Sequence, residues 1–427
     1  MNGLNYNQGS IEVDKFIENF YRDMYGKIVS YLTSKFGFDF LEASRDIAQD
    51  ALLTALENWK KKGMPENPEA WLFYVAKNKA INFLKKENKK LNIDTNLKVS
   101  NEKEFGNLEL ESEINDSMLK MMFVCCSDHI SSESQIVLIL SSLCGFKRKE
   151  IASAFLCEEE TIKKRLYRAK KKLRERKISF EIPEKKVLEE KLDIVCNVLY
   201  LLFNEGYNAS SGDKLIRKDF CYESLRLTHI LSENFREKQK IKALIALMYL
   251  QMSRFDSRLD KSESIVLFEQ QDRHLWNQNL IRMGASKLAE ASNGEDLSTY
   301  HLEAGIALEY CLSESYEEIN WKRIKELHIR SYEVNPSPLT LLNIAIVEGV
   351  SGDPAEAIHQ IKRIKKEYKK IAEYYLTHAA LGDFYSKMRE FETANEHYRT
   401  AMKLTSNEKE RDLIKKKKFF KENVLKK

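Results

Sequence analysis

Apolar residues recur at helical spacing along most of the chain, and one segment shows the pattern most clearly. In EEETIKKRLYRAKKKLRERK, residues 158–177, the apolar residues Ile162, Leu166, Ala169 and Leu173 follow one another at spacings of four, three and four. That spacing places them on one stripe of an α-helix whose other side is basic. The glutamates stand at the amino end, where the helix dipole favours negative charge. The segment therefore predicts a helix with one core-facing stripe and one cationic face.

Few helix breakers interrupt such patterns elsewhere. The 427 residues include only 15 Gly and 6 Pro, and strictly alternating patterns typical of β-strands are scarce. We therefore expect an all-α fold. A chain of this length exceeds what one hydrophobic core usually serves, so it should form two or three domains.

The helical patterns divide the chain into four parts. Residues 1–90 are predicted to form helices separated by a proline-containing turn. Residues 91–116 are polar and show no helical period, so they are predicted to be a flexible linker. Residues 117–180 contain two short helices joined by a tight turn, of which the second is the basic helix described above. This is the helix-turn-helix pattern. Residues 181–427 are predicted to be a succession of amphipathic helices.

Two stretches near the carboxyl end have similar layouts: a helix with small residues, a turn, and a second helix with alanine at a matching position. The matching alanines are Ala357 and Ala394. Their offset is close to the tetratricopeptide period of about 34 residues. We therefore expect stacked, tetratricopeptide-like helical hairpins in this part of the chain.

The basic residues are concentrated rather than spread evenly. The formal net charge of the whole chain is only +5. Between residues 145 and 177, however, thirteen Lys or Arg stand against five Glu, which leaves a local charge of +8. A helix-turn-helix with this charge favours a polyanion such as DNA as its ligand.

The compartment can also be predicted from the sequence. The amino terminus MNGLNYNQGS lacks the basic start and apolar run of a signal peptide, and no apolar segment approaches the length of a membrane span. Seven scattered cysteines fit a reducing environment. We therefore expect a cytoplasmic protein with no membrane partner.

A metal site or a catalytic thiol is the alternative interpretation of Cys125, Cys126 and His129. Adjacent cysteines on a helix point about 100° apart, and no second CxxC-type ligand pair follows them. No orienting acid and no glycine-rich phosphate loop of the Walker type occur in recognisable spacing. We therefore predict no metal, no cofactor and no catalytic residues.

Two helices in the first part of the chain suggest binding chemistry. The helix over residues 69–90 mixes aromatic residues with lysines and amides, which suits stacking on unpaired bases and holding phosphates, although we expect most of the aromatic residues to be buried in a core. The helix before it carries an edge formed by Asp46, Gln49 and Asp50, which suits a basic protein partner or is simply a solvated face.

These segments together resemble bacterial sigma factors of the extracytoplasmic-function (ECF) class. RDIAQDALLTAL is similar to the polymerase-binding helix of sigma region two, and WLFYVAKNKAINFLKK to its promoter-melting and minus-ten-reading helix. EIASAFLCEEETIKKRLYRAKKKLRE is similar to region four. The later segments LYLLFNEGYNASSGD, EQQDRHLW and NPSPLTLLNIA resemble the tetratricopeptide-like extension of one subgroup of this class.

The resemblance implies promoter recognition rather than catalysis, with core RNA polymerase and promoter DNA as partners. It places a polymerase-binding set against the clamp-helix coiled coil of the largest subunit: Asp46, Gln49, Asp50 and Leu53. It places a second set at the minus-ten element: Asn78, Lys79, Asn82, Lys85 and Lys86. It places a third set at the minus-thirty-five element: Glu160, Thr161, Lys163, Lys164, Arg165, Arg168 and Lys171. Relatives usually carry Asp where this chain has Asn82.

The part after residue 180 contains polar residues within otherwise apolar helices: Asn204, Glu205, Tyr207, Asp213, Arg217, Glu223, Arg226, Gln271, Asp272 and Arg273. They would either line a concave surface that binds a regulatory protein or ligand, or hold helices together through hydrogen bonds. We hypothesise that this extension regulates the sigma unit in place of a separate anti-sigma partner. The alternative is a helix-turn-helix DNA-binding regulator with a tetratricopeptide-like interaction domain that does not join polymerase.

Overall fold

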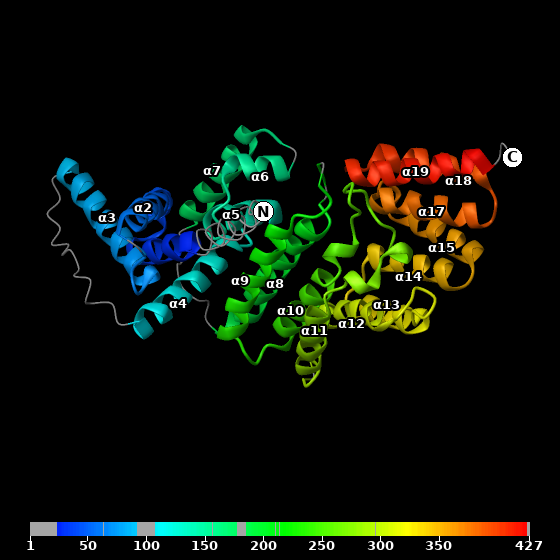
Figure 1. Cartoon of the computed structure of the whole chain (residues 1–427), viewed down its shortest axis with the longest axis horizontal. Helices are drawn as coiled ribbons and strands as arrows, with labels where there is room; N and C mark the ends of the chain where they lie inside the picture. Colours follow the sequence, from blue (N-terminus) through cyan, green and yellow to red (C-terminus); the bar gives the residue numbers. More distant parts are fainter. Residues whose placement is uncertain are drawn as a thin grey trace, which may run out of the picture. The chain divides into compact units, whose positions relative to one another are not determined.

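The computed structural model describes residues 24–62, 64–91, 107–155, 157–176, 185–209, 211–212, 214–294 and 296–424. The chain divides into two compact units: residues 1–153 with 157–198, and residues 154–156 with 199–427. Within the described ranges nearly all regular structure is helical, with one pair of two-residue strands (Figure 1). The all-α prediction is confirmed.

The first unit begins with helical residues 24–36 and then contains a short 3-10 turn and a series of helices. These are η1 (Phe38–Phe40), α2 (Leu41–Lys62), α3 (Pro68–Leu91), α4 (Asn107–Cys125), α5 (Ser132–Ser142), α6 (Arg148–Ala154), α7 (Glu159–Glu175) and the first half of α8 (Lys185–Tyr207). As expected, the turn between α2 and α3 contains prolines, and Pro68 opens α3, where its missing N–H costs nothing.

One core joins helical residues 24–36 to α3 and α4. Helical residues 24–36 bury Met24, Ile28 and Leu32, at a spacing of four, with 0% exposure. On one side, the Tyr31 ring meets the buried Phe73 ring of α3 edge-on, with centroids 5.4 Å apart. On the other side, the Ser30 hydroxyl lies 3.2 Å from the Met118 sulfur of α4. Residues 24–36 are therefore the shared core element of the unit.

Helix α4 corrects the predicted extent of the linker. The sequence suggested a structureless segment over residues 91–116, but α4 begins at Asn107 and runs to Cys125. The helical period was present in Leu110, Ile114 and Met118, at spacings of four, and was hidden by the acidic residues around them. Ile114 and Met118 are buried, which shows that this stripe faces the core.

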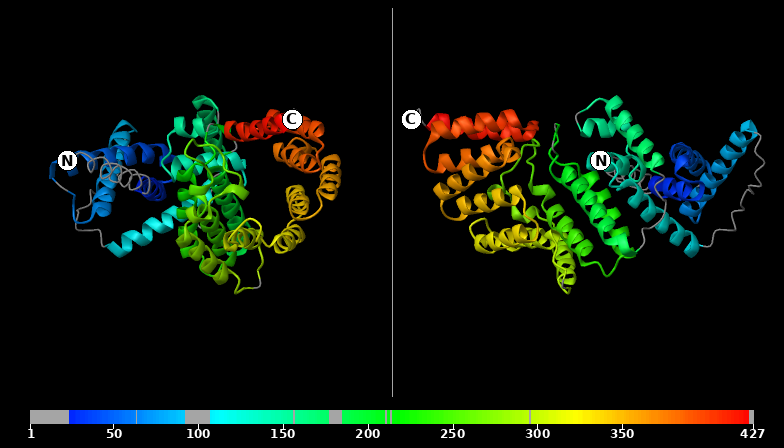
Figure 2. Two further views of the ribbon diagram at one scale, coloured as in Figure 1. Left: turned by 45° about the vertical axis from the view of Figure 1, so that its right-hand side comes forward. Right: turned by 180° about the vertical axis from the view of Figure 1, so that it is seen from behind.

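The second unit starts within α8 and continues through ten longer helices and several short elements. In order they are β1 (Ser211–Gly212), α9 (Lys218–Asn234), α10 (Gln239–Met252), η3 (Phe255–Ser257), η4 (Phe268–Gln270), η5 (Arg273–Leu275), α11 (Gln278–Ala291), α12 (Thr299–Leu312), α13 (Trp321–Val334), α14 (Pro338–Ser351), α15 (Pro354–Glu367), α16 (Lys369–Ala372), α17 (Tyr375–Lys387), α18 (Phe391–Leu404), β2 (Ser406–Asn407) and α19 (Glu408–Val424). Successive helices of this unit follow a curve that brings α19 back beside the segment where the unit begins (Figure 2).

The two predicted helical hairpins are present as α14 with α15 and α17 with α18. Ala357 and Ala394, the matching alanines, are both fully buried in one core cluster. Small residues allow the helices to approach closely: a Cβ added at Gly382 would lie 2.5 Å from the Tyr398 ring. The sequence-level repeat therefore corresponds to a real packing repeat.

Polar contacts join the two ends of the second unit. Strands β1 and β2 pair in parallel, with Ser211 opposite Ser406. The buried Asn407 amide donates to the carbonyl oxygens of Ala209 at 2.8 Å and Lys214 at 3.2 Å. Next to it, the buried Glu410 carboxylate accepts hydrogen bonds from the Tyr375 and Thr405 hydroxyls. The carboxyl-terminal helix is thus anchored to the beginning of the same unit.

Candidate functional site

Helix α7 has the two faces that its sequence predicts. Ile162, Leu166, Ala169 and Leu173 are all buried, at 4% exposure or less. Six of the seven residues proposed for the minus-thirty-five element are exposed: Glu160, Thr161, Lys163, Lys164, Arg168 and Lys171. The glutamates of the first turn and Lys172 and Arg174 in the last turn complement the helix dipole. Helix α7 therefore has one buried apolar face and one cationic face in solvent.

Two cations of α7 do not lie on that exposed surface. Arg165 is half-buried, and its guanidinium pairs with the Glu133 carboxylate of α5 at 3.1 Å. Lys170 is 7% exposed and pairs with Glu42 at the start of α2. Arg165 was predicted to approach DNA, whereas here it braces α7 against α5. Tertiary packing, rather than charge alone, therefore determines which basic residues remain available to a ligand.

The predicted polymerase-binding residues form one exposed stripe on α2. Asp46, Gln49, Asp50 and Leu53 are spaced by three, one and three residues, and all four are exposed. Leu53 is 57% exposed, while its helical neighbours Leu52 and Ala55 are buried. A large apolar side chain in water between acidic residues makes this stripe suited to a partner protein.

The predicted minus-ten residues of α3 are less uniform. Asn82 and Lys86 are exposed, whereas Asn78, Lys79 and Lys85 are half-buried. The Asn78 side-chain oxygen is enclosed and has no hydrogen-bond partner among the residues that the structure describes.

Two residues assigned to different partners pair with each other. The Lys79 ammonium of α3 lies 2.6 Å from the Asp50 carboxylate of α2. The side chains are 30% and 64% exposed, respectively. Such a solvated pair contributes about 1 kcal/mol or less, so either residue can exchange it for an intermolecular contact.

The aromatic residues of α3 are divided between core and surface. Phe73 is fully buried, Trp71 packs against Trp59 with ring centroids 5.8 Å apart, and Phe83 remains 42% exposed beside Phe40. The core interpretation is therefore correct for Phe73. Phe83 is exposed on the same turn as Asn82, where an unpaired base could stack on its ring.

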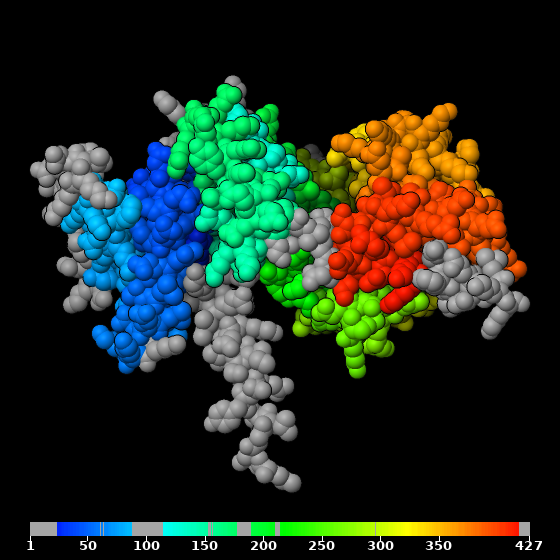
Figure 3. Space-filling model, turned by 90° about the horizontal axis from the view of Figure 1, so that it is seen from above, coloured from blue at the N-terminus to red at the C-terminus, as the bar shows by residue number. Residues whose placement is uncertain are grey.

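Helix α7 and the elements around α2 are held together by a direct interface. The Arg174 guanidinium lies 2.9 Å from the Asp39 carboxylate, and Lys170 pairs with Glu42. Burial opposes ionisation of Glu42, but Lys170, Arg45 and Arg148 together outweigh it and keep the pKa of Glu42 below its usual value. In the space-filling view the blue segment of residues 24–90 directly adjoins the cyan and green segment (Figure 3).

Close backbone packing completes this interface. A Cβ placed on Gly26 would lie 2.0 Å from the Leu143 carbonyl oxygen, and one on Gly145 would lie 3.1 Å from the Tyr25 ring. Gly145 also has a positive φ of 70°, which glycine adopts readily. Neither glycine was singled out from the sequence, because the partners that require them lie far away along the chain.

The exposed Tyr167 was also missed. It is 66% exposed and lies in the middle of the cationic face of α7, between Lys163, Lys164 and Lys171 on neighbouring turns. The available signal was its position outside the apolar stripe, which places it on the basic side. An aromatic ring there adds stacking and apolar contact to a surface otherwise built from charge.

The cysteine pair has none of the properties of a reactive site. Cys125 and Cys126 are 0% and 1% exposed. Burial raises the pKa of Cys125 to about 12 and that of Cys126 well above its usual value, so neither supplies a thiolate near neutral pH. No group of three or more potential metal ligands gathers anywhere in the described ranges. The two thiols are core residues.

Several polar residues of the extension hold its helices together, as the hydrogen-bonding interpretation predicts. The Arg273 guanidinium donates to the carbonyl oxygens of Tyr310 at 2.9 Å and Ser313 at 2.8 Å, so it caps the end of α12. The Gln271 amide oxygen accepts from Arg254 at 3.0 Å. Glu223 and Arg226 pair on α9 at 2.9 Å. Asp213 lies outside the described residues.

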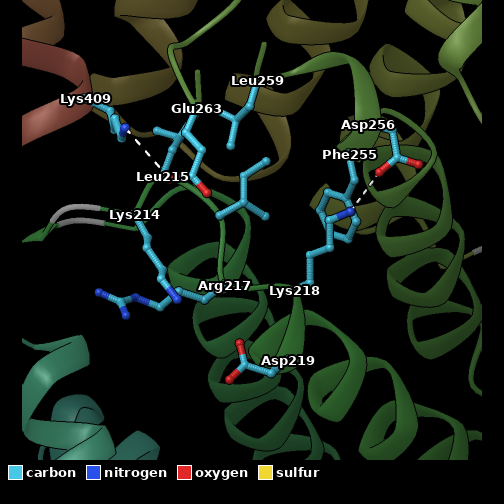
Figure 4. Close-up of a pocket in the computed structure, with 11 residues that line it drawn as sticks. Lys214, Leu215, Arg217, Lys218, Asp219, Phe255, Asp256, Leu259, Glu263 and Lys409 are labelled. Atoms are coloured by element: carbon cyan, nitrogen blue, oxygen red, sulfur yellow. Dashed lines mark hydrogen bonds and ion pairs between the residues drawn. The ribbon is translucent and has the colours of Figure 1, made fainter. Parts of the chain in front are cut away.

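One cavity of about 570 Å³ opens near the amino end of α9 (Figure 4). Its wall carries Lys214, Arg217, Lys218 and Lys409 together with Asp219, Asp256 and Glu263. The Lys218–Asp256 pair at 2.7 Å and the Lys409–Glu263 pair at 4.0 Å join some of these charges. Because both signs are present and partly paired, the cavity does not select a ligand of one charge.

Comparison with known families identifies the segments that carry these surfaces. The family model for sigma-70 region 2 matches residues 16–90, and the model for sigma-70 region 4 matches residues 120–173. A model described as a family of unknown function (DUF6596) matches residues 191–292. The two sigma-70 regions, which carry the exposed acidic and cationic faces, support a sigma factor with promoter recognition. Sigma factor families are not enzymes.

The sigma-70 region 2 and region 4 matches, followed by the DUF6596 segment, indicate an ECF-like sigma factor with a carboxyl-terminal extension. It is 28% identical over 377 residues to an uncharacterized protein of Rhizobium meliloti (strain 1021), which covers 87% of this chain and 88% of that protein. No solved structure matches. None of the described helices combines the length and apolar composition that crossing a membrane would require.

Proposed function

We propose that the first unit binds core RNA polymerase through the exposed stripe of α2 and directs it to promoters. Asp46, Gln49 and Asp50 supply negative charge and Leu53 an apolar anchor for the clamp-helix coiled coil of the largest subunit. The observation that carries this proposal is the 57% exposure of Leu53 within an acidic face that the protein's own fold leaves uncovered. Acidic residues around an apolar anchor form a compact protein-binding site.

Promoter contacts are divided between α3 and α7 in this proposal. Asn82, Lys86 and the exposed ring of Phe83 face the minus-ten element, where opened strands expose bases to amides, cations and an aromatic ring. Lys79 and Lys85, on the neighbouring turns, add phosphate contacts, and Asn78 adds an amide on the same side. The exposed cations of α7 face the minus-thirty-five element, with Glu160 and Thr161 nearest its amino end.

The interface between the two regions must open on DNA. The two promoter elements lie roughly 25 base pairs apart, which is on the order of 85 Å at 3.4 Å per step. In the structure, by contrast, Lys170 and Arg174 of α7 pair directly with Glu42 and Asp39 beside α2. We infer that polymerase and promoter binding replace these pairs, so the closed arrangement belongs to the free protein.

Binding to polymerase can be tested with a matched pair of variants. Leu53→Ala removes the exposed anchor and is expected to weaken capture by core polymerase about tenfold or more, since truncating a central apolar anchor costs roughly 2 kcal/mol. Lys61→Ala, an exposed residue of α2 two turns further along, should leave capture unchanged. Equal capture of both variants and the natural protein would contradict the assignment of α2.

Promoter recognition is tested by transcription in vitro with core polymerase on a random promoter library. The expected result is a set of transcripts that share two upstream elements. Lys163→Gln with Lys164→Gln should weaken the dependence on the upstream element more than on the downstream one. Initiation that is equally frequent on all templates would contradict promoter recognition by α3 and α7.

We further propose that the extension regulates the sigma unit. A truncation that tests this should end after Val198, because the first half of α8 belongs to the first unit and Lys191 pairs with Asp128 at 3.2 Å. The expected result is altered promoter-specific transcription by the truncated protein with core polymerase. Transcription that is unchanged in both level and control would leave the extension without this function.

A further inference from the structure

The solvent side of α15 continues into α16 as a run of positive charge. Six cations stand between residues 362 and 370, against the single acid Glu367. The six are Lys362, Arg363, Lys365, Lys366, Lys369 and Lys370. All except the half-buried Lys365 are exposed.

The fold places the four cations of α15, which are Lys362, Arg363, Lys365 and Lys366, outside its buried face, and Lys369 and Lys370 follow in α16 after a break at Tyr368. On the opposite side of α15, Ala357, Ile358, Ile361 and Ile364 are buried in the core cluster shared with α14, α17 and α18. Asp353 caps the amino end of the helix by accepting from the amides of residues 355 and 356, and proline occupies the first turn. The cations therefore project from a well-anchored helix rather than from a frayed end.

Acids on the neighbouring elements do not neutralise this face. The acid of α14, Glu348, pairs with Lys325, and that of α17, Asp383, pairs with Lys417. Within the described part of the chain Lys362, Arg363, Lys366 and Lys370 form no ion pair. Among these six cations of the described chain, only Lys369 forms an ion pair, with the Glu373 carboxylate at 3.8 Å.

The positive charge of Lys362 and Lys365 helps to lower the pKa values of two neighbouring histidines. Burial, together with repulsion from His378, Lys365 and Lys362, lowers the pKa of His397 to about 4. Burial and Lys365 likewise lower the pKa of His378. The Lys362 ammonium lies 5.3 Å from the centre of the Tyr385 ring, a contact that holds it without neutralising it.

We propose that the exposed face of α15 and α16 is a second nucleic-acid contact of this protein, which binds the phosphates of duplex DNA without reading base sequence. A surface of one sign, with cations repeated on successive helical turns of about 5.4 Å, complements a ligand of uniform opposite charge. Duplex DNA presents one negative charge about every 1.7 Å of its axis. Protein surfaces usually mix both signs, so DNA fits this face better than an acidic protein does.

This contact would add DNA-binding surface outside the regions that contact the two promoter elements. Lys and Arg contacts to phosphates add affinity and orientation but carry little sequence information. The extension would thus contribute to the affinity of the whole protein for DNA, independently of how α3 and α7 choose a promoter.

The test measures the salt dependence of DNA binding by the full-length protein on a duplex without promoter elements. The variant is Lys362→Gln with Arg363→Gln and Lys366→Gln. Each phosphate contact contributes about −0.9 to the slope of log Kobs against log salt, so the triple variant should flatten the slope by roughly 1 to 3. The matched control is Lys322→Gln with Arg323→Gln and Arg330→Gln, three exposed cations of α13, where Arg323 already pairs with Glu326 at 3.4 Å. The control should keep the natural slope.

Three outcomes would overturn the proposal. In the first, the salt slope of the α15 variant equals that of the natural protein. In the second, the α13 control flattens the slope as much as the α15 variant does. The α15 variant could also lose affinity for core polymerase while its DNA slope stays unchanged, which would assign the face to a protein partner. Lys366→Gln with Lys370→Gln is a milder second variant, expected to flatten the slope by roughly 1 to 2, should the triple change disturb folding. Because the duplex lacks promoter elements, failure here is distinct from failure of promoter recognition.

Discussion

The substitution Gly26→Ala tests the packing between sigma region 2 and region 4. Gly26 lies in helical residues 24–36, and an added Cβ would meet the Leu143 carbonyl oxygen at 2.0 Å and its carbon at 2.9 Å. An ordinary carbon–oxygen contact is about 3.3 Å or more. More than 1 Å of overlap must therefore be relieved, and both nearest atoms belong to the backbone, which cannot rotate away.

The expected cost can be estimated from two opposing effects. Overpacking a well-filled core costs about 1–3 kcal/mol, and the rigid backbone places this site near the upper end. Replacing glycine by alanine inside a helix returns about 1 kcal/mol. The net loss of stability is about 2 kcal/mol, which corresponds to a fall in Tm of roughly 4–8 °C for a unit of this size.

Hydrogen exchange of the full-length protein gives the free energy of opening for each segment of the first unit. Gly26→Ala should speed exchange in residues 24–36 and α5. Gly305→Ala in α12 is the control, because its new Cβ would meet only the Leu327 side chain at 3.4 Å, and it should be neutral or stabilising by up to about 1 kcal/mol. If Gly26→Ala left exchange in the first unit as slow as in the natural protein, the described interface would be wrong.

Three further outcomes follow from contacts of the extension. Asn407→Ala leaves the buried Ala209 carbonyl and the Lys214 carbonyl without their donor and should cost about 1–3 kcal/mol in urea unfolding; a loss below about 0.5 kcal/mol would contradict the proposed anchoring of α19. Asp353→Ala removes the cap of α15 and should cost about 1 kcal/mol, detectable as a lower urea midpoint, while an unchanged midpoint would argue against the cap. His328 and His397 have pKa values of about 4, lowered from 6.5 mainly by burial. Because the unfolded chain binds these protons first, the extension should lose stability as pH falls from about 6.5 towards 4, and His397→Gln should reduce that loss in urea titrations at several pH values.

Much of the candidate site could be predicted because helical faces are encoded locally. The spacing of Ile162, Leu166, Ala169 and Leu173 was sufficient to place the cationic side of α7 in solvent, and the structure agrees. The exposed edge of Asp46, Gln49 and Asp50 followed from the same period, whereas Leu53 was added by the family resemblance. Arg165 was placed at DNA by the family resemblance, and its role there stays a prediction, but its pairing with Glu133 depends on where α5 packs, which no local pattern gives.

Two kinds of feature were missed from the sequence. In some, acidic residues concealed an apolar helical stripe, and in others the feature depends on residues far away along the chain. The start of α4 was missed because acidic residues diluted an apolar stripe that Ile114 and Met118 nonetheless bury. The basic run of α15 was not singled out, because lysines are common on surface helices. Only the structure shows that the acidic residues of α14 and α17 pair with other cations. Polar residues such as Gln271 and Arg273 had two interpretations, and their hydrogen bonds within the extension favour the structural one.

The sequence alone determined that the chain is helical, that α2 and α7 each have one buried and one solvent face, and that two hairpins repeat near its end. These properties depend on residues three or four positions apart, and the periodicity of the helix converts such spacing directly into a face. Only the tertiary structure decided that Lys170 pairs with Glu42, that Gly26 must be small against Leu143, and that Asn407 joins the two ends of the extension. Those contacts link residues more than a hundred positions apart, and no local pattern specifies which distant surface a helix will meet.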